Sequence, residues 1–145
     1  MDENMELLEY IYKNSEMGVF TIKQMLKDLK EKDNKIKKLA DEEMKEYNKF
    51  QDEAKKIIKK YGYELKTNGI MAKIGSSMGI KKEVKKDNSD SALAHMLTEG
   101  ITMGVVDMET KLKNYKDTVD KKIYNLGKDF LEFQQKEIEK LKEFM

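Results

Sequence analysis

The chain has 145 residues, enough for one domain with one core, and its 29 basic and 28 acidic residues nearly cancel. It has no cysteine, which excludes disulfides and thiolate metal sites, and every basic residue is lysine, which disfavours the bidentate phosphate recognition typical of arginine. A net charge of +1 gives no reason to expect a nucleic-acid partner.

The first ten residues, MDENMELLEY, are acidic and lack the cationic start and the apolar run of a signal peptide. No apolar run approaches the roughly 20 residues that span a bilayer. We therefore expect a cytoplasmic protein. Its heavy use of lysine, asparagine and isoleucine is typical of AT-rich bacterial genomes.

Apolar residues recur at helical spacing in four long segments, which predicts helices over about 3–32, 34–61, 90–116 and 119–144. Short polar breaks separate the first helix from the second and the third from the fourth, so each pair should form a tight antiparallel hairpin. The polar break Lys32-Asp33-Asn34 supplies a predicted N-cap for the second helix, and Asn88, Ser89 and Asp90 supply caps for the third.

The connection between the second and third helices, residues 62–89, is about as long as a helix. This length lets the chain run back along the bundle before the second hairpin begins. The sequence therefore predicts an all-α, single-domain fold over residues 1–145. We expect a four-helix bundle of two antiparallel hairpins, joined by a long, partly helical crossover.

The two predicted hairpins share a short repeat, because Met17-Gly18-Val19 matches Met103-Gly104-Val105. The match suggests diverged copies that pack about a pseudo-twofold axis. Gly18 and Gly104 both lie on core stripes, where small residues allow close helix approach. The alternative is that each glycine is tolerated independently.

Polar residues interrupt the predicted core at five positions: Ser15, Glu43, Tyr47, Gln134 and Glu137. Counting back from the hairpin turns places Tyr47 and Gln134 near the two glycines. There they would fill the space left by the missing side chains and hydrogen-bond to each other, to Ser15 or to a carboxylate. We interpret this as a structural polar layer that fixes the helix register, with a small-ligand pocket as the alternative.

With this helix order and the Met-Gly-Val repeat, the chain resembles the ferritin-like superfamily, in the style of its rubrerythrin-related and uncharacterised bacterial members. That family's di-iron site uses glutamates on two helices and Glu-x-x-His on the other two. The ligand candidates that the resemblance implies here are Glu16, Glu43, Glu46, His95, Glu99 and Glu137. No Glu-x-x-His is present on the second or fourth helix, so we expect no metal or other cofactor. A di-iron or di-manganese centre is the alternative.

The crossover contains the stretch NGIMAKIGSSMGIKKEVKK, residues 68–86. Its glycines and serines weaken any helix there. Its candidate interaction residues are a short apolar stripe and neighbouring lysines, namely Ile70, Met71, Ile74, Met78, Lys73, Lys81 and Lys82. We expect the stripe to pack on the outside of the bundle, while an anionic membrane or a partner groove is the alternative.

The third predicted helix carries apolar residues on nearly every face, including Met96, Met103 and Val106 off its main stripe. A helix that is apolar all round is usually buried all round, so the crossover or a second subunit should cover it. We expect a homodimer, with this helix as one possible interface. A protein partner is left open, and no nucleic-acid or membrane partner is expected.

These observations favour a non-enzymatic binding or structural protein with no catalytic residues. Two alternatives remain. One is a metal-binding ferritin-like redox or storage protein, and the other is a protein that binds a membrane surface or a partner through its basic crossover.

Overall fold

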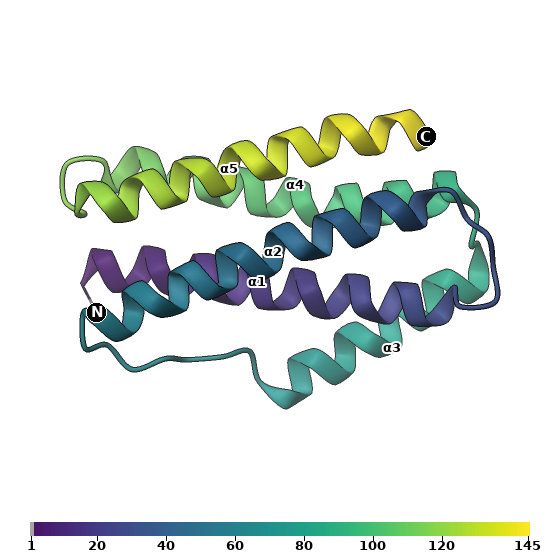
Figure 1. Cartoon of the computed structure of the whole chain (residues 1–145), viewed down its shortest axis with the longest axis horizontal. Helices are drawn as coiled ribbons and strands as arrows, with labels where there is room; N and C mark the ends of the chain where they lie inside the picture. The colour runs from purple at the N-terminus through teal and green to yellow at the C-terminus, as the bar shows by residue number, and fades with distance from the viewer. Residues whose placement is uncertain (1) are drawn as a thin grey trace.

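The computed structural model describes residues 2–145, and within that range the chain is helical and has no strand (Figure 1). The helices are α1 (Glu3–Asp28), α2 (Ile36–Lys60), α3 (Ile70–Lys86), α4 (Asp90–Tyr115) and α5 (Lys121–Leu141), followed by the 3-10 turn η1 (Lys142–Phe144). The helical periodicity of the sequence thus predicted the all-α class correctly.

The four long helices form two hairpins around one apolar core. α1 packs along α2, α4 packs along α5, and α3 lies on the outside of α1 (Figure 1). Each long helix contributes fully buried side chains, for example Ile11, Ile58, Met108 and Phe130. An all-helical fold with a partly helical crossover is therefore confirmed. None of the helices in residues 2–145 is long and apolar enough to cross a membrane.

Two helix starts use side-chain caps close in sequence. Asp2 accepts a hydrogen bond from the Met5 backbone N–H at 2.8 Å, which caps α1. Ser89 caps α4 as predicted, because its hydroxyl accepts the Ala92 N–H at 3.1 Å. Each cap satisfies a backbone donor that has no partner inside the helix.

The start of α2 is capped from elsewhere in the chain, so the predicted N-cap within Lys32-Asp33-Asn34 is wrong. The Asn34 amide instead donates to the Asn88 carbonyl at 2.8 Å and to the Asp90 carboxylate at 3.0 Å. The same carboxylate accepts the backbone N–H groups of Lys35 at 3.3 Å and Ile36 at 3.4 Å. The first residue of α4 therefore closes the first turn of α2.

The end of α2 depends on Gly62, whose φ of +73° is the one positive value within residues 2–145. The N–H of Gly62 bonds to the Lys59 carbonyl, and the N–H of Tyr63 bonds to the Ile58 carbonyl, both at 3.0 Å. This Schellman arrangement needs a left-handed residue at Gly62, which glycine adopts without a steric penalty. It turns the chain out of the bundle and into the crossover.

The crossover helix α3 packs on α1 through a different face from the one predicted. Ile80 and Val84 are buried, whereas Ile70 and Met71 are 76% and 79% exposed. Met78 is 66% exposed as well. The expectation that the Ile70–Met78 stripe packs on the bundle is therefore wrong. The glycines within α3 do not prevent a helix, because this second stripe holds it against the protein.

The off-stripe apolar residues of α4 are not covered by the crossover. Met103 is 72% exposed and Val106 is 58% exposed, while Met96 is partly buried. The expectation that the crossover covers this face is wrong, because α3 lies against α1 and leaves this face of α4 open. Dimerisation through this face stays a prediction.

The packing of α3 can be tested by comparing two truncations in one helix. Ile80→Ala should lower the free energy of unfolding, or of α3 detachment, by about 2 kcal/mol, because it removes a buried side chain. Met78→Ala should change it by less than about 0.5 kcal/mol, because Met78 is exposed. Amide hydrogen exchange across residues 70–86 measures both. An equal loss of amide protection in Ile80→Ala and Met78→Ala would contradict the packing of α3 through Ile80.

Candidate functional site

The ring of Tyr47 occupies the space that a side chain at position 18 would need. A β-carbon placed on Gly18 would lie 2.8 Å from two ring carbons of Tyr47. The opposite side of the ring meets Phe133 and Phe130 edge-on, with ring centroids 5.0 Å and 6.1 Å away. α1 therefore carries a glycine at this point because α2 inserts an aromatic ring there.

Gly104 makes the equivalent space in the second hairpin. A β-carbon placed on it would lie 2.9 Å from Asn14 Nδ2 and 3.0 Å from Gln134 Nε2. Tyr47 and Gln134 thus fill the places beside the two glycines, as the repeat predicted. The predicted close approach of α1 and α4 is not what results. These helices contact each other only sparsely, and a cavity lies between them.

A hydrogen-bonded network connects the two hairpins at this level. Gln134 Nε2 donates to the Tyr47 hydroxyl and to Asn14 Oδ1, both at 3.4 Å. Asn14 Nδ2 donates to the Tyr10 hydroxyl at 3.3 Å, and that hydroxyl donates to the Gly104 carbonyl at 3.3 Å. The sequence pattern did not single out Tyr10 and Asn14, which lie on α1 two turns and one turn before Gly18.

Two buried carboxyl groups, Glu43 on α2 and Glu137 on α5, flank this network. Burial raises the pKa of Glu43 to about 8, helped by the charge of Glu137 and a hydrogen bond with it. Burial also raises the pKa of Glu137, while Lys140, whose Nζ lies 3.4 Å away, opposes the shift. The pair therefore holds a proton on Glu43 at neutral pH, and the ammonium stabilises the charge of Glu137.

The polar layer has unused hydrogen-bonding capacity. Ser15, Glu43 and Gln134 are at most 1% exposed. Oε2 of Glu43 and Oε2 of Glu137 are buried without a hydrogen-bond partner among the described residues. Within residues 2–145, Ser15 Oγ and Gln134 Oε1 have no hydrogen-bond partner. Buried polar atoms are nearly always paired, so the Ser15 hydroxyl can donate or accept a further bond and Gln134 Oε1 can accept one.

The cavity between α1 and α4 has a volume of about 550 Å³. Its polar and charged lining comprises Glu6, Glu9, Tyr10, Lys13, Asn14, Thr21, Glu43, Tyr47, Asn68, Asp107 and Lys111. Its apolar lining includes Met17, Ile22, Met96, Leu97, Ile101 and Met103. The Met-Gly pairs of the repeat thus line the same cavity from α1 and from α4.

The other metal-ligand candidates, which the resemblance to the ferritin-like superfamily implies, do not lie together. Glu16 accepts two hydrogen bonds from Asn68, each at 2.8 Å, and so anchors the crossover to α1. Glu46 is only partly buried and pairs with a lysine of its own helix. His95 and Glu99 are exposed on α4. Among residues 2–145, no three acidic or histidine side chains gather as metal ligands. Glu43 and Glu137 alone come together, which does not fit the donor set of a di-iron centre.

Comparison of the chain with protein-family models, with curated proteins and with solved structures gives no match. Its function must therefore be argued from the chemistry of this site.

The contact between Gly18 and Tyr47 predicts a large difference between two glycine substitutions. Gly18→Ala should lower the free energy of unfolding by about 1–2 kcal/mol, because overpacking against a held ring outweighs the gain in helix propensity. Gly100→Ala, in the middle of α4, should raise it by roughly 0.5–1 kcal/mol, because a β-carbon there meets no atom within 4 Å. Urea unfolding measures both, and stabilisation by Gly18→Ala would contradict the tight contact.

The raised pKa of Glu43 predicts that stability falls as pH rises. The unfolded glutamate ionises near its ordinary value of 4.5, whereas the folded one keeps its proton up to about 8. Between these values the folded state binds more protons, so unfolding becomes easier by up to about 1.4 kcal/mol per pH unit. Glu43→Gln should flatten this decline, because glutamine still donates to Glu137 and cannot ionise.

Urea unfolding between about pH 5 and pH 9 measures the decline. Glu46→Gln, one turn further along α2 and partly exposed, is the matched control and should keep the slope of the wild type. A wild-type stability that rises from pH 5 to pH 8 would contradict the assignment of the buried proton.

Proposed function

We propose that this chain is a cytoplasmic, non-enzymatic binding protein that holds a small, mostly apolar molecule in the α1–α4 cavity. The observation that carries the proposal is a cavity of about 550 Å³ whose lining combines apolar side chains with the buried polar groups of Glu43 and Tyr47. Cavities that bind small molecules combine this size with such a lining. A raised pKa in the same place, that of Glu43, is a further feature typical of functional sites.

The polar groups favour a ligand with one neutral hydrogen-bonding group. The Tyr47 hydroxyl accepts from Gln134 and so keeps its own proton to donate, and burial raises its pKa so that it stays neutral. Glu43 is also neutral at pH 7 because of its raised pKa. Tyr47 and Glu43 therefore offer hydrogen bonds without a formal charge. The charged side chains that also line the cavity, such as Lys13, Lys111 and Asp107, are not fully buried.

A polar layer with only a structural role accounts for fewer of these observations than a ligand-binding role does. Such a layer would fix the helix register best if every buried group were paired, yet Ser15 Oγ and Gln134 Oε1 are not paired within residues 2–145. It would also give no reason for a cavity beside it. We further propose that the bundle is ferritin-like, which the two hairpins and the intervening crossover support, and that it does not use the di-metal chemistry of that family.

The proposal predicts saturable binding of the neutral fluorescent probe N-phenyl-1-naphthylamine, which brightens in apolar surroundings. Gly100 lines the cavity, and a β-carbon on it meets no atom within 4 Å. Gly100→Phe can therefore fold normally while its ring fills the cavity, and it should weaken probe binding at least about tenfold. Fluorescence titration at fixed protein concentration gives the dissociation constants.

His95→Phe is the matched control, because His95 is exposed on the same helix and does not line the cavity. This variant adds the same apolar ring elsewhere on α4 and should bind the probe like the wild type. Equal affinity in Gly100→Phe and His95→Phe would place the probe outside the cavity and contradict the proposed function.

A further inference from the structure

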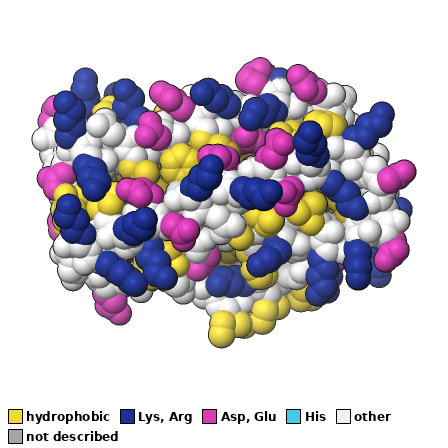
Figure 2. Space-filling model, in the orientation of Figure 1, with side chains coloured by type: hydrophobic (Ala, Val, Ile, Leu, Met, Phe, Trp, Pro, Cys, Tyr) yellow, Lys and Arg dark blue, Asp and Glu magenta, His cyan; other side chains and the backbone are white. Residues whose placement is uncertain are grey.

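Ligand binding in the α1–α4 cavity does not explain the outward face of α3. Ile70, Met71, Ile74 and Met78 are 76%, 79%, 47% and 66% exposed, and we call them the α3 outer face. Figure 2 shows hydrophobic side chains gathered at the lower edge of the molecule, where Figure 1 places α3. Contiguous exposed apolar side chains of this kind usually mark an interaction site.

The α3 outer face is exposed although a different face of α3 packs against the rest of the protein. Ile80 and Val84 are buried against the bundle. Ser77 donates a hydrogen bond of 2.9 Å to Gln24 on α1. The outer face is therefore not a core face that has failed to pack.

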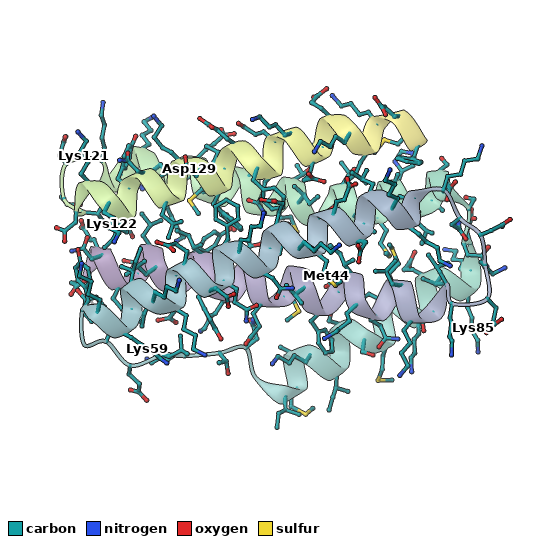
Figure 3. All side chains as sticks on the ribbon, in the orientation of Figure 1. Met44, Lys59, Lys85, Lys121, Lys122 and Asp129 are labelled. Atoms are coloured by element: carbon teal, nitrogen blue, oxygen red, sulfur yellow. The ribbon has the colours of Figure 1, made fainter. Side chains whose placement is uncertain are left out.

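The outer face continues into lysines along the same side of the helix. At about 100° per residue, the four apolar side chains lie within about 100° of arc, and Lys81 and Lys85 fall on that arc one and two turns later. Figure 3 shows Lys85 at the end of α3 next to the turn into α4, at the edge of the bundle. One side of α3 is thus apolar in its first half and basic in its second half.

The charge of this region differs from that of the rest of the chain. Residues 66–86 contain six lysines and one glutamate, although the net charge of the whole chain is only +1. The remaining residues are consequently net acidic. An anionic surface attracts α3 and repels the rest of the protein. Each lysine close to the surface contributes about 1 kcal/mol to the binding free energy.

We propose that α3 docks the protein onto an anionic membrane surface. The outer face enters the interface between head groups and acyl chains, and Lys81, Lys82 and Lys85 contact lipid phosphates. A bilayer offers an apolar layer directly beside a layer of negative charge, which matches the order of side chains along α3. The helix lies on the surface and does not cross it.

A second copy of the chain matches the outer face poorly. If two α3 helices paired antiparallel, the apolar half of each would meet the lysines of the other. If they paired in parallel, lysines would face lysines, and like charges repel. Four apolar side chains also bury far less than the roughly 1,200 Å² of a stable interface.

The test is vesicle co-sedimentation of the whole chain. Vesicles of phosphatidylcholine with about a quarter phosphatidylglycerol should bind the protein, vesicles of pure phosphatidylcholine should bind it at least tenfold more weakly, and high salt should release it. Met71→Glu should reduce binding to the anionic vesicles at least about tenfold, because it places a carboxylate at the most exposed position of the outer face.

Val106→Glu is the matched control, since Val106 is 58% exposed on α4, away from the outer face. It should bind the anionic vesicles like the wild type. Absence of wild-type binding to these vesicles would overturn the proposal, as would equal losses in the two variants. So would a dimer in analytical ultracentrifugation that Met71→Glu abolishes, because it would assign the face to a second copy. None of these results depends on whether the α1–α4 cavity binds a ligand.

Discussion

The insertion of Tyr47 beside Gly18 is the contact on which the arrangement of the long helices depends. The ring replaces a side chain of α1, rests edge-on against Phe133, and accepts a hydrogen bond from Gln134 on α5. One residue of α2 therefore touches both hairpins at the same level. Because Tyr47 and Gln134 fill the space beside the two glycines, α1 and α4 are not drawn together, and the cavity between them remains.

The polar layer lowers the free energy of unfolding, and its presence therefore indicates a functional role. A buried polar group without a partner costs about 1–3 kcal/mol, and a buried carboxyl pair is less favourable than a well-packed apolar one. Ser15, Glu43 and Gln134 could all be replaced by apolar residues in an ordinary bundle core. Proteins commonly keep such unfavourable groups where function requires them, and here they lie beside the α1–α4 cavity.

The sequence was informative wherever local pattern decides structure. Periodicity located the four long helices, Ser89 capped α4 as expected, and the polar residues on apolar stripes were buried as their positions indicated. The sequence did not decide the structure where two apolar stripes of one helix could each pack against a distant part of the chain. α3 has two apolar stripes, and only the surface of α1 selects Ile80 and Val84. A pocket at the glycine layer was one of two alternatives, and the sequence could not decide between them, because the cavity depends on how much of the space beside Gly18 and Gly104 is left unfilled.

The cap of α2 has a consequence for the order of folding. Its first turn is closed by Asp90, a residue that is synthesised some fifty residues after Ile36. As the chain leaves the ribosome, the first hairpin therefore stays frayed at this end until the start of the second hairpin has emerged. Long-range contacts of this kind slow folding and join its steps into one transition. The two hairpins, although each resembles a complete unit, reach their final form together.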